Sequence, residues 1–569
     1  MKAERTSGTN KTEKTLRSYA YDSYGKIRQI KDCQNPLGNG DKTIQRTYTY
    51  DSFDRVKTMV YTDLSDSEKV LESYAYEYDK NSNIVKKTEK NDAPSKQEEK
   101  IHQTKEYTYD SQGRLTKTVT TDHRKKDQKE TITYTYDAAG NRLSEDNGSQ
   151  KTVYTYNGLD QIQRATTAKG LAVDEVKDYT YDANGNQTAV KSTKTGEIFN
   201  YGYDAENRLE EVSVTKDGTT AQIQRNTYNG EGQRIQKIEG DQTINYYYQD
   251  GTVSYTTDGN GSQTGQNLIG LEGNVIGTQR YEEKGAVYYT YHKDIQGSTT
   301  TLMKEDGSVD ASYEYTDFGE TTVHGDNKAG NEVCYTGGIY DSTTGLYYLN
   351  ARHYNPEDRR FLTEDTYRGE TKEPDTWHLY AYCANNPVNY TDPSGHKKII
   401  NISRSLERLM INNANILRNK MKNSFTGTYG SRVKKIISVF RFFYNKVKTK
   451  GDWDLKRKRA WKLNEKKEVY KYGSKKLYRN DDVGNIHFGY VGSVLFAREF
   501  LCFGAGIYQI KSSTSKKWKY ALSYGDDPHD TSMIRYGNTL YHRISGSYNK
   551  KNKKYITYKP KIVQAKKKR

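Results

Sequence analysis

Two histidines near the end of the chain offer the groups that an acid–base reaction needs. Cleavage of an RNA phosphodiester without a metal requires a base for the 2′-hydroxyl, an acid for the leaving oxygen and a cation on the phosphate. His487 and His529 could act as the base and the acid, and Arg498 or Arg535 as the cation. These residue types are compatible with acid–base chemistry on a phosphate.

A cluster of acids beside His529 allows other interpretations. Asp526 or Asp530 could orient a histidine, or Asp526, Asp527 and Asp530 could bind a divalent ion such as Mg²⁺ through oxygen ligands. The acids also fit the start of a helix, with Asp527 as the N-cap and Pro528 at the first helical position. We favour metal-free chemistry without a cofactor, because a helix cap already explains these acids.

Helices and turns must bring these residues together. Residues 397–450 carry apolar side chains at helical spacing, interrupted at 426–430, which predicts two helices. They would form either a linker or the helical layer of a C-terminal domain. Residues 456–462 and 495–510 are also predicted to be helical, whereas Gly484-Asn485 is expected to form a turn.

Charge divides the chain into two parts. From His396 onward there are 42 Lys and Arg against 11 Asp and Glu, a net charge of +31; because the whole chain carries +17, residues 1–395 carry −14. A basic module on an acidic carrier indicates binding to nucleic acid or to an acidic partner. A solvated lysine-rich surface is the alternative. The tail 551–569 interleaves Lys with Tyr and would supply phosphate contacts and stacking faces.

A repeat of the form Tyr-x-Tyr-Asp-x-x-Gly/Asn fills the acidic part. Tyr-x-Tyr places two aromatic side chains on one face of a strand, and the residues after Asp supply a turn, so each unit is predicted to be a β-hairpin. Consecutive hairpins would form one antiparallel sheet. We expect the tyrosines to pack against one face of this sheet, and we favour this over an additional role in carbohydrate binding. The second tyrosine recurs at steps of 20 to 31 residues, typical of stacked units, at Tyr21, Tyr50, Tyr78, Tyr109, Tyr136, Tyr156, Tyr181, Tyr203 and Tyr228.

Residues 340–396 close this array and contain Ala351-Arg352-His353-Tyr354, Arg360-Phe361-Leu362, Asn385-Asn386-Pro387 and Asp392-Pro393-Ser394-Gly395. The stretch resembles the Rhs-repeat-associated core of YD-repeat polymorphic toxins of the Rhs and WapA type. The resemblance implies a mostly β shell, a coiled array of antiparallel hairpins, followed by a separate mainly α or α+β toxin domain. The implied domains are a repeat array (1–290), the core (291–396), a helical linker or first part of the toxin (397–450) and the toxin (451–569).

The resemblance also implies self-cleavage. In several relatives an Asp-Pro-x-Gly-Leu motif is cut after Leu, which releases the toxin. Asp365 and Asp392 would form an aspartyl acid–base pair, with Arg359 or Arg360 keeping one of them ionised. His396 stands where the relatives have Leu, and a plain turn at 392–395 is the alternative. His292 is expected to be packed or at the surface, without a partner that would make it catalytic.

Residues 450–540 resemble the bacterial toxin 44 family in three motifs: Gly-Asn-x-x-x-Gly-x-x-Gly at 484–492, Ala-Gly-x-x-Gln at 505–509 and Gly-Asp-Asp-x-x-Asp at 525–530. The resemblance implies an RNase toxin for interbacterial competition, secreted or wall-associated, which acts on RNA in the target-cell cytoplasm. Its partners would be RNA, a cognate acidic immunity protein and the cell wall or target surface. The alternative is a surface binding or structural repeat protein with a basic tail that anchors it to wall polymer.

Neither disulfides nor membrane spans are indicated. Cys33, Cys334, Cys383 and Cys502 lack the spacing of a metal site or a disulfide framework. No stretch reaches the roughly 18 apolar residues of a membrane span. Met1 is followed by no apolar signal sequence and the chain begins inside a repeat, so we expect the tail of a longer secreted protein.

Overall fold

The chain divides into two compact units, Asp32–Ile399 and a second that combines Met1–Lys31 with Ile400–Arg569. In this computed structural model the described residues are 2–7, 10–22, 27–34 and 42–395, without 54, 250, 271–272, 283–284, 367 and 369–376. Beyond 395 they are 399–401, 417, 420, 438–446, 469–472, 475–477, 482–492, 495 and 534.

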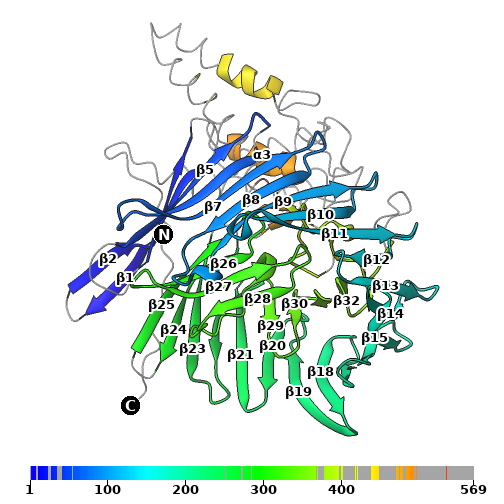
Figure 1. Ribbon diagram of the computed structural model, residues 1–569. Coiled ribbons are helices and arrows are strands. Elements are labelled where there is room, and N and C mark those ends of the chain that lie inside the picture. Colours follow the sequence, from blue (N-terminus) through cyan, green and yellow to red (C-terminus); the bar gives the residue numbers. More distant parts are fainter. Residues whose placement is uncertain are drawn as a thin grey trace, which may run out of the picture. The chain divides into compact units, whose positions relative to one another are not determined.

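The unit Asp32–Ile399 is built on an antiparallel sheet in which β5 to β28 pair in chain order (Figure 1). This arrangement confirms the predicted mostly β array of consecutive hairpins. The strands are β5 Thr43–Tyr50, β6 Val56–Asp63, β7 Lys69–Tyr78, β8 Ile84–Asn91, β9 Ile101–Tyr109, β10 Leu115–Asp122, β11 Gln128–Tyr136, β12 Arg142–Asp146, β13 Lys151–Tyr156, β14 Ile162–Lys169, β15 Ala172–Tyr181, β16 Gln187–Ser192, β17 Ile198–Tyr203, β18 Leu209–Lys216, β19 Thr219–Tyr228, β20 Arg234–Glu239, β21 Gln242–Gln249, β22 Thr252–Thr257, β23 Gln263–Ile269, β24 Val275–Glu282, β25 Gly285–Lys293, β26 Thr299–Lys304, β27 Val309–Tyr315 and β28 Thr321–Gly325.

The repeat motif forms a fixed turn at the end of a strand. In the copy at Tyr109, the Asp110 Oδ1 atom accepts hydrogen bonds from the main-chain N–H groups of Gln112 and Arg114, each at 2.9 Å. Gly113 has φ +83°, a conformation that glycine adopts without a Cβ penalty. The carboxylate therefore satisfies the turn's own backbone donors, which explains why Asp follows the second tyrosine.

Neighbouring repeats are joined by the side chains that follow this turn. Arg114 donates through Nε to Asp110 Oδ2 at 2.6 Å and through Nη1 to the carbonyl oxygen of Asp137, in the next turn, at 2.9 Å. Tyr136, the second tyrosine of the next copy, donates to the Leu115 carbonyl oxygen at 2.8 Å, and the Arg114 guanidinium lies 4.8 Å from its ring centroid. The motif thus links consecutive turns as well as shaping each one.

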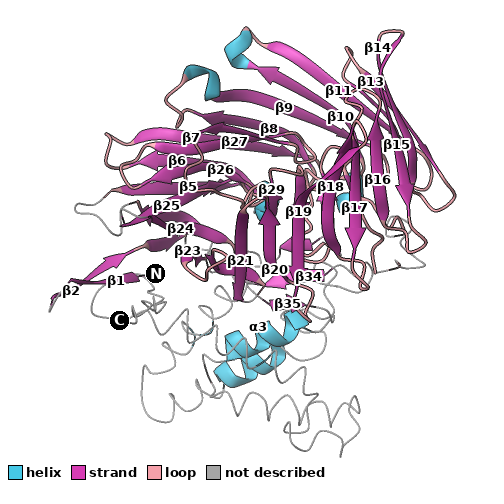
Figure 2. Ribbon diagram, turned by 90° about the horizontal axis from the view of Figure 1, so that it is seen from below, coloured by secondary structure: helices cyan, strands magenta, loops and turns pink. Residues whose placement is uncertain are grey.

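The sheet extends beyond the nine copies recognised in the sequence. Strand β25 pairs with β24 and β26 across residue 290, so the sheet continues without a break into the stretch assigned to the core. Contacts between distant strands, such as Tyr61 Oη to the Lys293 carbonyl oxygen at 2.8 Å, place β25–β27 against β6–β9 (Figure 2). The sheet therefore curls until strands far apart in sequence meet.

The core segment after β28 packs against this sheet. It contains the short strands β29 Ile339–Asp341, β30 Leu346–Tyr348, β31 His353–Asn355 and β32 Arg360–Phe361, which form a four-stranded antiparallel sheet. Short 3-10 helices lie at Gln97–Glu99, His123–Lys125, Tyr335–Gly337 and Tyr382–Asn385. One apolar cluster joins Tyr347, Tyr354 and Phe361 of the core to Tyr291 and Leu302 of the large sheet.

A buried ion pair attaches the core to the sheet. The Asp341 carboxylate accepts from Arg234 Nη1 at 2.5 Å and Nη2 at 3.0 Å, and both side chains are fully buried. Lys237 Nζ lies 3.2 Å from Asp341 Oδ1 and 2.6 Å from Glu332 Oε1. Burial alone would raise the pKa of Asp341, but the charges of Arg234 and Lys237 outweigh it and lower that pKa.

In the other unit, β1 Lys2–Ser7 pairs with β2 Asn10–Thr15. Strands β3 Arg17–Tyr21 and β4 Ile27–Cys33 follow, and β4 runs across the division between the units. Strands β33 Ile399–Asn401, β34 Val469–Tyr472 and β35 Lys475–Leu477 form a small sheet, and helices lie at 438–446 and at α3 Asp482–Gly492. Within 397–450, residues 438–446 are helical as predicted, whereas 399–401 are a strand. None of the described helices is long and apolar enough to cross a membrane.

Candidate functional site

Asp365 and Asp392, far apart in the core sequence, meet at one arginine. Arg352 Nη2 lies 2.7 Å from Asp365 Oδ2 and 3.9 Å from Asp392 Oδ2. The three side chains are 5, 11 and 3% exposed in the order Arg352, Asp365, Asp392. The structure therefore brings together the two acids that the sequence predicted as a pair.

The end of the core is fixed beside this cluster. Arg352 Nε donates to the Gly395 carbonyl oxygen, Ala351 N donates to the Ser394 carbonyl oxygen at 3.2 Å, and Asn350 Nδ2 donates to the Pro393 carbonyl oxygen at 2.8 Å. Gly395 has φ +69°, and a Cβ there would lie 2.6 Å from the Leu349 carbonyl oxygen. Only glycine fits so close to the main chain at this position. Gly395, the last residue of the Asp392-Pro393-Ser394-Gly395 motif, therefore lies against Arg352.

The surroundings of the two acids differ. Asp365 has the close ion pair, whereas Asp392 Oδ1 accepts from Ser394 N at 3.3 Å and Ser394 Oγ at 3.1 Å. Burial lowers the pKa of the Arg352 guanidinium and outweighs the opposing charges of the two carboxylates. Two carboxyls in unlike surroundings can divide acid and base roles between them.

The predicted assignment of Arg359 or Arg360 to these acids is wrong. Arg359 contacts Glu145 and lies 3.3 Å from Glu320 Oε1, and Arg360 Nη2 donates to the Asp160 carbonyl oxygen at 2.7 Å. Arg352 is the arginine that contacts both acids, and its guanidinium lies 3.6 Å from the Phe361 ring centroid. Sequence proximity favoured the arginines near Asp365, but the turn between β30 and β31 presents Arg352. Its place in the Ala351–Tyr354 motif was the available signal.

His292 is packed, and it has a partner. Its Nδ1 atom lies 2.7 Å from Glu72 Oε1, and its ring stacks on Tyr61 with centroids 4.2 Å apart. Glu72 also accepts from Tyr74 Oη and Thr300 Oγ1, each at 2.7 Å. His292 therefore joins β25 to β6 and β7, and this explains its burial structurally.

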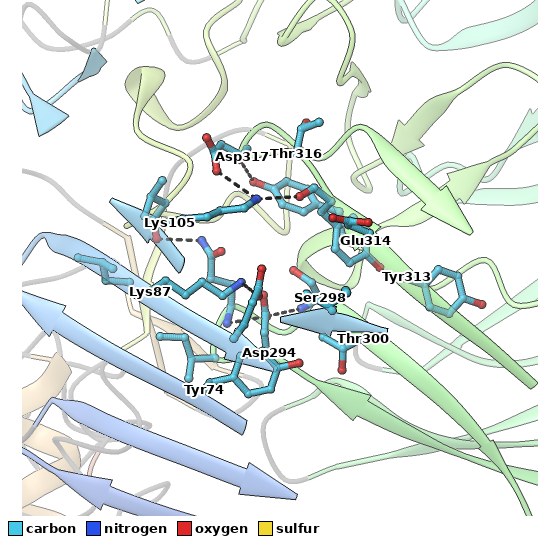
Figure 3. A pocket seen from close by; sticks show the side chains of 18 of the residues that line it. Tyr74, Lys87, Lys105, Asp294, Ser298, Thr300, Tyr313, Glu314, Thr316 and Asp317 are labelled. Carbon is cyan, nitrogen blue, oxygen red and sulfur yellow. Dashed lines mark hydrogen bonds and ion pairs between the residues drawn. The ribbon is translucent and has the colours of Figure 1, made fainter. Parts of the chain in front are cut away.

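A small polar cavity lies nearby, between β7–β9 and β25–β27 (Figure 3). Its volume of about 60 Å³ is roughly that of two water molecules. The lysines that line it are already paired: Lys87 with Glu89, and Lys105 with Asp317 Oδ1 at 3.7 Å. The cavity thus suits ordered water, and both of its lysines already have carboxylate partners.

Most of the predicted nuclease residues fall outside the described residues: Arg498, Asp526, Asp527, His529, Asp530 and Arg535. His487 is described and is fully buried in α3, where neighbouring Phe488 stacks on Phe443 with centroids 5.9 Å apart. The turn predicted at Gly484-Asn485 is wrong, because both residues lie inside α3. Among the described residues there is no group of three His, Cys, Asp or Glu side chains that could hold a metal.

Comparison with known protein families decides the class of the large unit. The family described as Teneurin YD-shell matches residues 93–388, slightly more than half of the chain. The chain belongs to the Teneurin YD-shell family. The YD-shell match covers the hairpins from β9 onward and most of the core, and it confirms the predicted repeat family. Residues 442–543 match the family described as Bacterial toxin 44, where the sequence motifs predicted it.

Curated relatives include bacterial nucleases. The chain is 32% identical over 282 residues to the tRNA3(Ser)-specific nuclease WapA of Bacillus spizizenii and to the tRNA nuclease WapA of Bacillus subtilis strain 168. Each match covers 47% of this chain and 11% of the relative, so the chain spans about a tenth of their length. A solved structure, the Photorhabdus luminescens Tc holotoxin pore, is 18% identical to this chain and has a TM-score of 0.35. The match covers 67% of this chain and 21% of the solved chain.

Proposed function

We propose that this chain is part of a secreted, contact-dependent polymorphic toxin whose YD-shell body encloses and delivers a basic nuclease domain. The supporting observation is that three boundaries lie close together. The YD-shell match ends at residue 388, the toxin 44 match begins at 442, and the net charge changes from −14 to +31 at His396. A carrier followed by a distinct polyanion-binding module accounts for all three.

RNA is the proposed substrate. A net charge of +31 suits binding to a phosphate backbone. Two relatives of the chain are named tRNA nucleases, which favours RNA over DNA. The alternative, a wall-associated binding protein with a basic anchoring tail, rests on the same charge and needs no catalysis.

In the metal-free mechanism, a histidine removes the 2′-hydroxyl proton and a second histidine protonates the leaving oxygen. His529 and His487 would take these roles, with Arg498 or Arg535 on the phosphate and Asp526 or Asp530 orienting a histidine. Because His487 is fully buried in α3, its replacement is expected to affect stability as well as activity. The alternative is that Asp526, Asp527 and Asp530 hold Mg²⁺.

Growth and cleavage assays test the proposal. Induced expression of the full chain inside bacteria should arrest growth, and the purified chain should cleave RNA. His529→Ala should reduce cleavage by about 10²–10⁴-fold in the metal-free mechanism, with activity retained in EDTA. His542→Ala is the control, because it removes a histidine of the same segment that has no proposed role. Soluble chain that cleaves no RNA, either intact or after limited proteolysis has opened the body, would favour the wall-binding alternative. Binding to purified wall polymer would then test that alternative.

The proposed location and partner of the protein follow from the proposed toxin function. The protein would be secreted or wall-associated, and its C-terminal domain would act in the target-cell cytoplasm. A cognate acidic immunity protein would protect the producing cell, since the charge of the toxin domain favours an acidic partner. Co-expression of the small acidic protein encoded next to this chain should restore growth.

Self-cleavage at the end of the core is a second proposed activity, supported by the Asp365–Arg352–Asp392 cluster. One carboxylate would remove a proton from an attacking water while the other carboxyl protonates the leaving amide nitrogen. The proposal is supported by Gly395, the residue before His396, whose carbonyl oxygen accepts from Arg352 beside the acids. Mass spectrometry of the full chain should find a fragment that begins directly after His396, and Asp392→Asn should abolish it. An intact wild-type chain would refute this activity while leaving the nuclease proposal open.

A further inference from the structure

The turn at residues 378–381 connects the Asp365–Arg352–Asp392 cluster to the repeat array. The Leu379 carbonyl oxygen accepts from Arg352 Nη1 at 2.9 Å and from the main-chain N–H of Asp365 at 3.0 Å. One carbonyl group therefore holds both the cation and one of the two acids. A displacement of this turn would move both groups together.

His378 fixes the turn through both ring nitrogens. Nδ1 accepts from the main-chain N–H groups of Tyr380 at 3.2 Å and Ala381 at 3.0 Å, which caps the turn. Because Nδ1 accepts, the ring proton lies on Nε2. Nε2 is 2.9 Å from Asn141 Oδ1 and donates to it, and Arg360 Nη2 lies 2.8 Å from the same nitrogen. One nitrogen thus shapes the turn, and the other ties it to Asn141.

Asn141 belongs to a repeat turn and is oriented there by two carboxylates. Its Nδ2 atom donates to Asp137 Oδ2 at 3.0 Å and to Asp160 Oδ1, in the next turn, at 2.7 Å. These bonds direct Oδ1 towards His378. Gly140 lies beside the ring, since a Cβ there would be in ordinary van der Waals contact with His378 Cδ2, at 3.6 Å.

Other core side chains extend this contact over the row of repeat turns. Asn385 Nδ2 donates to the Gly140 carbonyl oxygen at 2.9 Å, and Tyr380 Oη donates to the Gly185 carbonyl oxygen at 2.7 Å. Arg360 reaches the turn between them at Asp160. The segment that carries Leu379 therefore takes its position from several folded repeats.

We infer that His378 is a positioning residue of the self-cleavage centre, and that its bond to Asn141 makes cleavage depend on the folded repeat turns 137–141 and 157–161. The inference rests on the proposed self-cleavage and adds its regulation. An incomplete array lacks Asn141 in its oriented form, so Leu379 would not hold Arg352 and Asp365 in register. Cleavage would then follow completion of the shell and would not precede it.

Two substitutions in the full chain separate the roles of the ring nitrogens. His378→Asn keeps an acceptor near the Nδ1 position and loses the link to Asn141. His378→Gln keeps a donor near the Nε2 position and restores that link. Cleavage is followed over time by gel and mass spectrometry, and thermal unfolding checks the fold. His123→Asn is the control, because His123 bonds Thr104 and Asp127 at another hairpin.

We expect His378→Asn to slow cleavage about 10–100-fold, as for a small misplacement of reacting groups. His378→Gln should cleave faster than His378→Asn, because it keeps the donor to Asn141 although it loses the acceptor at Nδ1. Asn141→Ala should slow cleavage as much as His378→Asn. The double variant His378→Asn, Asn141→Ala should be no slower than either single variant, since both substitutions remove the same bond. Wild-type cleavage by His378→Asn, or slower cleavage by His378→Gln than by His378→Asn, would overturn the inference. A wild-type chain that stays intact, like Asp392→Asn, would instead refute self-cleavage itself.

Discussion

Replacing Asp341 by Asn tests how the core is held in the YD shell. The carboxylate accepts two hydrogen bonds from Arg234 and one each from Lys237 and Gln224, in a fully buried position. Asn keeps the shape but removes the charge. Arg234 would then lose its only carboxylate among the ion pairs of the described residues, whereas Lys237 would keep Glu332 and Glu239.

The expected cost follows from this burial. Removing one partner of a buried ion pair typically costs about 3–5 kcal/mol, because the other charge stays buried without compensation. The double variant Arg234→Met, Asp341→Leu removes both charges and should be less destabilised than Asp341→Asn. The pKa of Asp341 is lowered by folding, so the contribution is present above the unfolded carboxyl value of about 4 and is lost as the pH falls through the lower folded value. The difference between wild type and Asp341→Asn should therefore be full at pH 7 and shrink below pH 4.

The assay is urea unfolding of the full chain, followed by far-UV circular dichroism and by protection of the body from protease. Asp178→Asn is the matched control, since Asp178 forms an exposed pair with Arg164 at 2.6 Å and should leave the midpoint unchanged. A midpoint for Asp341→Asn equal to that of Asp178→Asn would refute the view that this pair fixes the core. A double variant less stable than the single one would refute the explanation by uncompensated charge.

Three further predictions concern the repeat link, the end of the core and pH. Tyr228→Phe removes the 2.6 Å bond to the Leu209 carbonyl oxygen and should cost about 1 kcal/mol in urea unfolding, whereas Tyr247→Phe, at an exposed ring, should cost less. Gly395→Ala should reduce self-cleavage at least about tenfold, roughly 1.4 kcal/mol in the barrier, because the added Cβ would meet main-chain atoms. Gly330→Ala is the control, since Gly330 also has positive φ but faces open space, and it should leave cleavage intact. Burial, with the Arg234 charge, lowers the pKa of His353 to about 3, so stability should fall as the pH drops from about 6.5 towards 3, and a midpoint independent of pH over that range would contradict it.

The repeat motif made the local structure of the array predictable. Strands end at Tyr109, Tyr136 and Tyr203, as the Tyr-Asp boundary predicted, because the Asp side chain satisfies the turn that follows. The same reasoning missed the hairpin of β22 and β23, where Asp258 forms an equivalent turn without the full motif. Local hydrogen bonds explain both outcomes, since the turn requires Asp and a permissive backbone more than it requires tyrosine.

The candidate sites were only partly predictable from the sequence. The pairing of Asp365 with Asp392 was predicted from a motif, whereas the choice of Arg352 over Arg360 depended on which turn of the core faces the acids. Gly484-Asn485 was predicted to be a turn from its composition, but Ile486, Tyr490 and Val491 bury one side of a helix there. Packing of those apolar residues outweighs the weak local preference of Gly and Asn.

Sequence alone therefore determined the hairpin repeat, the change of charge at His396 and the two family matches, because each depends on local pattern or composition. Tertiary structure decided which distant groups meet: Arg234 with Asp341, Glu72 with His292, and Leu379 with Arg352. The first two pairs are separated by several strands of the large sheet, which curls to bring them together, whereas the path of the core brings Leu379 to Arg352. A short-range pattern carries no information about such contacts, since their geometry is set by the packing of the whole unit.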